Sequence, residues 1–255
     1  MIEVSTAGHV LSIHLDRPES RNAINGEMAV AIEAAVLRLD ADPELWVGTL
    51  AANVGDGDRP VFCAGADLRE IGHSRFFTKA GGFGGFVRLP RTKPFVAGVD
   101  GLALGGGFEL VLACDIVVAT PRAGFGLPEV RRNLIAAGGG VFRLPRAVGG
   151  HIALDMMLTG EAISAERALE LGLVSRLVES AELPATVERV AEAVCAGGPV
   201  AVRTSREIAL AALGADEDRL WEMTDAAARG LGRSSDTKEG VAAFLERRVP
   251  RWTGS

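Results

Sequence analysis

Two glutamates in the middle of the chain have the type and the setting for proton transfer. Glu109 lies two residues after Gly105-Gly106-Gly107, and Glu129 directly follows Gly126-Leu127-Pro128. Glycines that open a helix leave backbone N–H groups bare to whatever lies in front of them. Two carboxylates beside such donors are the groups needed to move protons next to a polarised carbonyl. The pattern therefore indicates acid–base chemistry.

The glycine triplet needs a reason of its own, because each glycine in a helix interior costs roughly 0.8–1.0 kcal/mol relative to alanine. A phosphate loop would need Gly-Lys-Ser/Thr after the run, and a dinucleotide fingerprint would need Gly-x-Gly-x-x-Gly. The sequence here supplies neither. An oxyanion hole remains, in which two N–H groups converge on one oxygen. The candidate donors are Gly106 and Ala66, the latter in the turn Cys63-Ala64-Gly65-Ala66-Asp67-Leu68.

The elements that must position these residues alternate between strands and helices. A hairpin is predicted over residues 2–4 and 10–15, and Asn25-Gly26 leads into a helix over about 27–39 with one apolar stripe. Other strand-like segments lie at 46–51, 60–63, 95–99, 115–119, 124–125 and 172–178. This alternation predicts an α/β architecture. Residues 73–88, with glycines and phenylalanines alternating, are either a loop with buried aromatics or a mobile cover over an apolar tunnel.

From residue 183 onward the pattern is almost entirely helical, with helices predicted over 183–195, 199–213, 216–231 and 237–248. Gly197-Gly198 interrupts it, and Pro199 suits a helix start. We therefore expect an α/β unit over 1–196 and a helical region over 197–255.

The bulk composition excludes several classes of function. Hydrophobic residues make up 48% of the 255 residues and charged residues 24%, which is typical of a globular protein. The net charge is −6 and no Lys/Arg block occurs, which disfavours a nucleic-acid partner. No apolar stretch is long enough to span a bilayer, and the N-terminus lacks the features of a signal peptide. Three cysteines without ligand spacing favour a reducing, cytoplasmic setting and no metal site.

Five segments together resemble the enoyl-CoA hydratase/isomerase (crotonase) family, in order and over nearly the whole chain. They are Arg21-Asn22-Ala23-Ile24-Asn25, the 63–68 turn, the 105–110 run, Phe125-Gly126-Leu127-Pro128-Glu129 and the stretch from Glu239 to Trp252. The resemblance implies a core of repeated ββα units and a C-terminal helical region that builds homotrimers, often paired into hexamers.

The resemblance also implies roles for individual residues. It places the thioester oxyanion hole at the N–H groups of Ala66 and Gly106, and the acid/base pair of a hydratase at Glu109 and Glu129. Coenzyme A contacts are expected at Ala64, Asp67, Leu68 and Arg69, and at Phe244 and Arg247, often from a neighbouring subunit. The substrate would be an acyl-CoA thioester, and no metal or redox cofactor is implied, since coenzyme A arrives with the substrate.

The sequence departs from the family pattern after Glu129, where Asn133 and Ala136 stand at places commonly held by glycine and proline. Glu19 stands where some relatives keep a lysine. These changes leave acyl-chain preference open. The expected activity is hydration of a trans-2-enoyl-CoA. An isomerase or dehydratase acting on a specialised acyl-CoA, or a non-catalytic acyl-CoA-binding subunit, are the alternatives.

Overall fold

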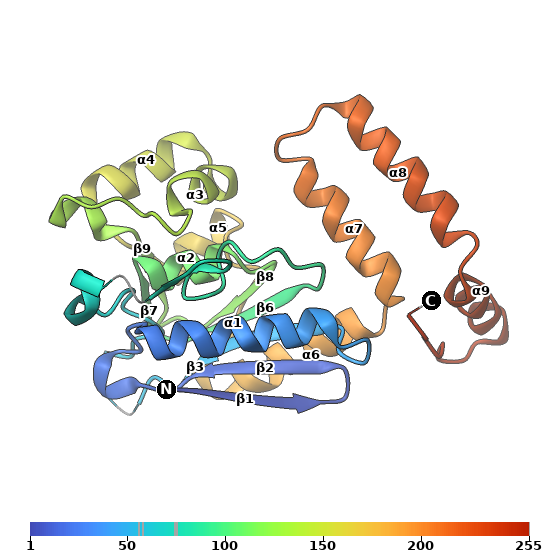
Figure 1. Cartoon of the computed structure of the whole chain (residues 1–255), viewed down its shortest axis with the longest axis horizontal. Coiled ribbons are helices and arrows are strands. Elements are labelled where there is room, and N and C mark those ends of the chain that lie inside the picture. The colour runs from blue at the N-terminus through green and yellow to red at the C-terminus, as the bar shows by residue number, and fades with distance from the viewer. Residues whose placement is uncertain (56, 58, 74–75, 255) are drawn as a thin grey trace.

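A six-stranded sheet forms the centre of the α/β unit (Figure 1). The computed structural model describes residues 1–55, 57, 59–73 and 76–254. The strands, in spatial order, are β1 (Ile2–Ala7), β2 (Val10–Leu15), β3 (Val47–Ala52), β6 (Phe95–Val99), β8 (Ile116–Ala119) and β11 (Arg176–Leu177). β1 and β2 form an antiparallel hairpin, and the other neighbours run parallel. The predicted hairpin and α/β architecture are therefore confirmed.

Two smaller sheets complete the strand arrangement. β9 (Gly124–Gly126) lies between β7 (Leu102–Leu104) and β10 (Ile163–Ser164), and β4 (Phe77–Thr78) pairs with β5 (Gly82–Phe83). The β7–β9 pair is parallel. β7 ends just before the segment that holds Glu109, and β9 ends just before the segment that holds Glu129.

Nine helices occur in the described part of the chain. They are α1 (Gly26–Ala41), α2 (Gly106–Leu112), α3 (Gly140–Val148), α4 (Gly150–Thr159), α5 (Ala165–Glu170), α6 (Leu183–Cys195), α7 (Pro199–Ala211), α8 (Glu217–Leu231) and α9 (Ser235–Glu246). Short 3-10 helices lie at Pro18–Ser20, Leu68–His73, Pro128–Arg132 and Ser180–Glu182. The helices predicted at 27–39 and 183–195 are confirmed, as are the C-terminal ones, with ends shifted by one or two residues.

Helices α1 and α6 cover opposite faces of the central sheet. Adjacent strand residues point to opposite faces, so in β6 Ala97 faces the main core while Val96 packs with the α6 residues Val187 and Val190. The side chain of Asn25 caps α1 by accepting a hydrogen bond from the Met28 N–H at 2.9 Å. The central strands β3, β6 and β8 are thus buried between two helical layers, which suits their parallel pairing.

The strand predicted at 60–63 is not formed. Only Cys63 makes an isolated bridge, to Ala103. Asn22 explains the difference, because its side-chain amide donates to the carbonyl of Val61 at 3.2 Å and so takes an acceptor that a ladder would use. Proline at position 60 also lacks an N–H to donate.

Helices α3, α4 and α5 were not predicted from the sequence. α3 starts after Gly139 and carries Pro145 in its interior, and α4 starts at Gly150. Glycine and proline at these positions contradict ordinary helix signals, so tertiary packing stabilises these helices. Leu144 in α3 and Met156 in α4 are buried in the main core.

The segment after residue 75 agrees with a loop whose aromatic side chains are buried. Phe76, Phe83 and Phe86 belong to the main core, and Phe76 lies 6.1 Å from Phe83 between ring centroids. Residues 74 and 75, part of the same prediction, lie outside the described residues.

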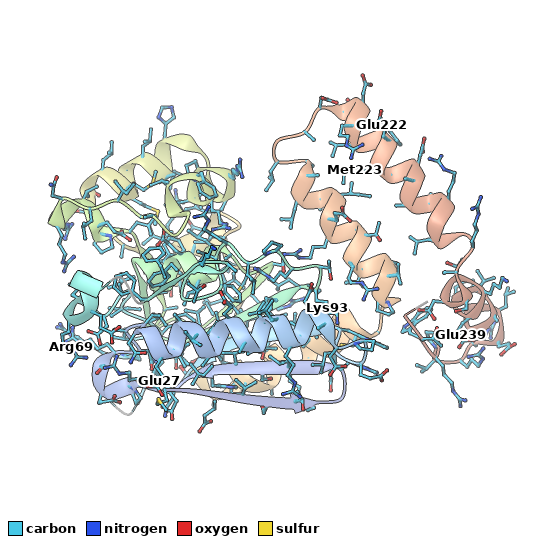
Figure 2. All side chains as sticks on the ribbon, viewed as in Figure 1. Glu27, Arg69, Lys93, Glu222, Met223 and Glu239 are labelled. Atoms are coloured by element: carbon cyan, nitrogen blue, oxygen red, sulfur yellow. The ribbon has the colours of Figure 1, made fainter. Side chains whose placement is uncertain are left out.

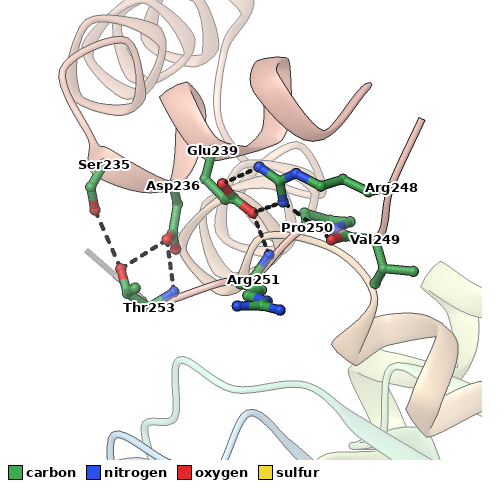
Figure 3. Close-up of a pocket in the computed structure, with 8 residues that line it drawn as sticks. All are labelled: Ser235, Asp236, Glu239, Arg248, Val249, Pro250, Arg251 and Thr253. Carbon is green, nitrogen blue, oxygen red and sulfur yellow. Dashed lines mark hydrogen bonds and ion pairs between the residues drawn. The ribbon is translucent and has the colours of Figure 1, made fainter. Parts of the chain in front are cut away.

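The C-terminal helices form an arm that projects from the α/β unit (Figure 1). α7 and α8 form an antiparallel pair, and α9 with the C-terminal end lies beyond them. Trp252 fixes the tail by donating from its indole to the carbonyl of Ala196 at 2.9 Å. Figure 3 shows the tail folded against α9, where Arg248 donates to Glu239 at 2.6 Å and the Thr253 N–H donates to Asp236 at 2.7 Å.

Among the described residues, no helix combines the length and the apolar character that crossing a membrane would require.

Candidate functional site

The turn at residues 63–67 aims the Ala66 N–H away from its neighbouring segment. Ile24 and Ala66 form a parallel bridge, in which the Ile24 N–H donates to Gly65 at 2.8 Å and the Asp67 N–H donates to Ile24 at 2.9 Å. In such a bridge the two hydrogen bonds use the residues on either side of Ala66. The N–H of Ala66 itself therefore points to the opposite side, where the glycine triplet lies.

The turn and the triplet are in direct contact. A Cβ added to Gly65 would lie 3.1 Å from the backbone nitrogen of Gly106. Gly106 begins α2, and the first hydrogen bond of this helix runs from the Glu109 N–H to Gly105 at 3.0 Å. The earlier N–H groups, including that of Gly106, have no acceptor inside the helix. The two predicted oxyanion donors are thus brought to adjacent positions.

Each glycine of the triplet has a different structural reason. Gly105 has a φ of +55°, a conformation that favours glycine. A Cβ on Gly106 would lie 2.3 Å from the ring of Phe83, and one on Gly107 would lie 2.2 Å from the carbonyl oxygen of Cys63. The expected need for close backbone approach is therefore confirmed at this position.

The segment at residues 21–25 contacts the 63–67 turn and holds it in place. This supporting role was not predicted from the sequence. Asn22 is fully buried, with a φ of +51°, and its amide donates to Asn53 at 2.8 Å as well as to Val61. The carbonyl of Asn22 accepts from the Cys63 thiol at 3.1 Å, and the carbonyl of Arg21 accepts from the Ala64 N–H at 3.0 Å. The signal was present in the Arg-Asn-Ala-Ile-Asn motif, but only as a resemblance.

Glu109 lies on α2 with only 3% of its surface exposed. One carboxylate oxygen accepts a hydrogen bond from the Gly140 N–H at 2.8 Å. A Cβ on Gly138 would lie 2.5 Å from its other oxygen. The absence of side chains at Gly138 and Gly140 therefore leaves the space that this carboxylate occupies.

Glu129 lies in the 3-10 helix Pro128–Arg132 and points back to the triplet. One of its carboxylate oxygens lies 3.2 Å from the position that a Cβ on Gly105 would occupy. Its other oxygen is buried and has no hydrogen-bond partner among the described residues. An unsatisfied buried carboxylate oxygen is costly in a resting protein, so a donor from a bound molecule would be favourable at this point.

Burial dominates the electrostatics of both acids. The pKa of Glu109 is raised to about 7, mainly by burial, with the Gly140 N–H lowering it and the nearby Glu129 carboxylate also contributing to the rise. Burial also raises the pKa of Glu129. Neighbouring carboxyls resist double ionisation, so both glutamates are expected to hold a proton to higher pH than exposed glutamates do.

The predicted coenzyme A contacts on the turn have mixed surroundings. Asp67 is buried, and the guanidinium of Arg69 donates to its two oxygens at 2.9 and 2.8 Å while Arg17 donates at 2.8 Å. Hydrogen bonds from Arg69 and then Arg17 hold the pKa of Asp67 far below its usual range. Asp67 thus anchors the exposed Arg69, and Ala64 and Leu68 are exposed beside it.

Phe244 and Arg247 are not brought to this site within one chain. They lie on and just after α9, where Phe244 is 83% exposed. Figure 2 places Arg69 at one end of the molecule and Glu239, also on α9, at the other. Contact between these residues and the site would require a second copy of the chain.

Two of the three departures from the family pattern, Asn133 and Ala136, lie near Glu109 and Glu129, and the third, Glu19, lies elsewhere. Asn133 ends the 3-10 helix of Glu129 with a φ of +55°, and Ala136 is buried beside Gly140. Glu19 is mostly exposed and lies 3.7 Å from Arg17. Within the described residues, no group of three or more His, Cys, Asp and Glu side chains is arranged to hold a metal ion.

Comparison with known proteins gives this geometry a family context. Residues 5–255 match the model of a family described as enoyl-CoA hydratase/isomerase. A mevalonyl-coenzyme A hydratase from Aspergillus fumigatus is 37% identical over 254 residues, covering 97% of this chain and 92% of that protein. A carnitinyl-CoA dehydratase from Proteus mirabilis is 34% identical over 262 residues, covering 99% and 98%.

A solved structure agrees over the full length. The crystal structure of an enoyl-CoA hydratase from Mycobacterium tuberculosis H37Rv superposes with a TM-score of 0.94 at 38% identity, covering 100% of this chain and 99% of that one. The crotonase-like fold that the sequence resemblance implied, with its helical C-terminal region, is therefore confirmed. The chain belongs to the enoyl-CoA hydratase/isomerase family.

Proposed function

We propose that this chain is an enoyl-CoA hydratase, a hydro-lyase that adds water syn across the double bond of a trans-2-enoyl-CoA thioester. One observation carries the proposal: the Glu129 carboxylate and the N–H groups of Ala66 and Gly106 lie at the glycine triplet, and the buried Glu109 carboxylate, on the helix that the triplet opens, is near enough to Glu129 for the two acids to interact.

In the proposed mechanism the thioester oxygen binds between the N–H groups of Ala66 and Gly106. A 2-enoyl thioester becomes electrophilic at C3 as negative charge moves onto this oxygen. Fixed backbone donors stabilise that charge without reorganisation, and removing one donor from such a site costs about 2.7–4 kcal/mol. Gly106 packs closely against the Phe83 ring and Gly107 against the Cys63 carbonyl, and this packing keeps the donors rigid.

The two acids perform the proton transfers. The Glu109 carboxylate accepts a proton from water as the water oxygen bonds to C3, and the protonated Glu129 gives its proton to C2. The singly protonated pair supplies one acceptor and one donor, which a pKa of about 7 at Glu109 makes accessible near neutral pH. The steps form the C3–O and C2–H bonds by proton transfer and addition of water, and they use neither a metal ion nor a redox cofactor.

A homo-oligomer, a trimer or a dimer of trimers, is part of the proposal. The arm exposes large apolar side chains, among them Trp221 at 60% and Phe244 at 83%, and α8 has no buried residue in a single chain. A second copy that covers these residues would also bring Arg247 to the adenine end of coenzyme A, opposite Arg69. The three free cysteines fit a reducing cytoplasm.

A second candidate is reversible dehydration of an acyl-CoA with a polar acyl group. Two relatives at 37% and 34% identity carry the names mevalonyl-coenzyme A hydratase and carnitinyl-CoA dehydratase. Hydration and dehydration are two directions of one reaction, so the same acids and donors serve both. The identity of the acyl group separates the two candidates.

The test is turnover of purified protein on a panel of acyl-CoA thioesters, followed by the loss or gain of enoyl absorbance. Rapid hydration of crotonyl-CoA and longer 2-enoyl-CoAs is the expected result. Turnover confined to acyl groups with hydroxyl or ammonium substituents would favour the second candidate. Tight binding of the whole panel without turnover would instead identify a non-catalytic acyl-CoA-binding subunit.

A further inference from the structure

Arg143 connects two backbone segments that lie beside the candidate site. It lies in the first turn of α3, half-buried, and neither Glu109 nor the glycine triplet receives a hydrogen bond from it. One guanidinium nitrogen donates to the carbonyl of Gly138 at 3.0 Å, and another donates to the carbonyl of Val87 at 2.6 Å. Two backbone segments 51 residues apart, at 87 and 138, are thus held by one planar group.

The Gly138 side of this bridge controls Glu109. The turn at 138–140 supplies the Gly140 N–H that donates to the Glu109 carboxylate at 2.8 Å. Gly139 has a φ of +105°, and a Cβ there would lie 2.3 Å from the guanidinium of Arg143. The arginine therefore packs directly on the turn, and the turn sets the orientation of the carboxylate.

The Val87 side of the bridge reaches the oxyanion donor. The Val87 N–H donates to Phe83 at 3.4 Å. The Phe83 ring fills the space beside Gly106 that a Cβ would otherwise occupy. A change in the distance between Val87 and Gly138 would therefore alter the relative position of the acid and the oxyanion donor.

We propose that Arg143 is a positioning residue: by clamping Gly138 to Val87, it holds the Glu109 carboxylate in register with the Gly106 donor. The inference rests on the hydratase function proposed above. A lysine cannot replace the clamp, because its single ammonium nitrogen cannot reproduce the planar fork of a guanidinium.

The charge of Arg143 also acts on Glu109. Burial has the largest effect on the pKa of Glu109 and raises it, the Gly140 N–H lowers it, Glu129 raises it, and Arg143 has the smallest of these effects and lowers it. Arg91, Arg146, Cys114 and Glu109 are the titratable groups that act on Arg143 itself. Removing the charge should therefore raise the pKa of Glu109, whereas a lysine should largely preserve it. This difference separates the charge of Arg143 from its clamping geometry.

The test compares Arg143→Met, Arg143→Lys and the control Arg146→Met in the full-length protein. Arg146 lies on the same helix, is exposed, and stands 5.7 Å from the Phe142 ring. Arg143→Met is expected to lower kcat by about 10- to 100-fold, the scale of a 1 Å misplacement of a reacting group, with KM changed by less than about twofold. Its acid limb of kcat should move to higher pH.

Arg143→Lys should lose most of the same rate but keep the acid limb of the original protein, and Arg146→Met should change neither. A parallel measurement needs no turnover: the titration of the Glu109 carboxyl, followed by ¹³C NMR of glutamate-labelled protein and assigned with Glu109→Gln. That titration should move to higher pH in Arg143→Met alone.

The outcomes are distinct. A kcat of Arg143→Met equal to that of the unsubstituted protein would overturn the proposal. A loss of rate no larger than the unfolded fraction of the variant, together with an unmoved Glu109 titration, would also overturn it. If Arg143→Met does not fold, the rate of folded Arg143→Lys decides, and full activity there would overturn the clamp. If the original protein hydrates no enoyl-CoA, the proposed function fails, while the NMR titration still decides whether Arg143 acts on Glu109.

Discussion

The candidate site in the α/β unit and the C-terminal arm differ in the surroundings that they give to individual glycines and glutamates. At the site, Gly107 is packed against the Cys63 carbonyl and the Glu109 carboxylate is buried. In the arm, Gly230 in α8 has open space where a side chain would be, and Glu239 is paired with an exposed arginine. Both site residues are thus enclosed by their own chain, whereas no residue of α8 is buried within it.

The largest difference between the two regions is expected at Glu109 and Glu129, the two proposed catalytic acids. Glu109→Gln and Glu129→Gln should each lower kcat by at least about 100-fold, the usual scale of general acid–base catalysis, because each removes one half of the proton transfer. The measurement is the loss of enoyl absorbance at saturating substrate. The matched arm variant, Glu239→Gln, should retain kcat, and equal losses in all three would deny the acids a special role.

Glycine-to-alanine substitutions should have opposite signs in the two regions. Gly107→Ala places a Cβ 2.2 Å from the Cys63 carbonyl oxygen, and we expect the free energy of unfolding to fall by about 3 kcal/mol, as in overpacked cores. Gly230→Ala meets no atom within 4 Å and should stabilise α8 by about 0.5–1 kcal/mol. Urea unfolding of both variants checks this; a stable Gly107→Ala would contradict the packing described.

The pH dependence of stability should distinguish the buried Glu109 from Glu239, which is paired with Arg248. Because the folded pKa of Glu109 is raised to about 7, its protonated form stabilises the fold at low pH, and that contribution is lost as pH rises from about 4.5 through 7. Relative to Glu109→Gln, the free energy of unfolding of the unsubstituted protein should fall by on the order of 2 kcal/mol between pH 5 and 7.5. Unfolding curves at four pH values measure it, and a constant difference would oppose the prediction.

Glu239 should show the smallest effect and the opposite sign. Hydrogen bonds from Arg248 and from the Arg251 N–H lower the pKa of Glu239 to about 2. Its stabilising contribution is therefore present above pH 4.5 and is lost as pH falls toward 2. Thermal unfolding of Glu239→Gln should show a small loss at pH 7 that disappears near pH 2. Since the pair is exposed, salt should also reduce the loss.

Local sequence patterns predicted most of the helices and strands, and they predicted the close backbone approach at the glycine triplet. The stripe of Met28, Ile32 and Val36 predicts α1 because period 3.6 is a property of the helix alone. The glycine triplet likewise predicts close approach, whatever packs against it. By contrast, α3 begins at glycine and contains Pro145, so no local signal could reveal a helix that only its neighbours stabilise.

By itself, the sequence determined which residues can do chemistry here: Glu109, Glu129 and the bare N–H groups beside the glycines. Only the tertiary structure decided that the carboxylate of Glu109 rests on Gly140, that Asn22 holds the oxyanion turn, and that Arg143 ties Gly138 to Val87. Residue type and spacing specify a group's chemical capacity. Its pKa and direction depend on burial and hydrogen bonds from segments distant in the chain, and these exist only once the chain has folded.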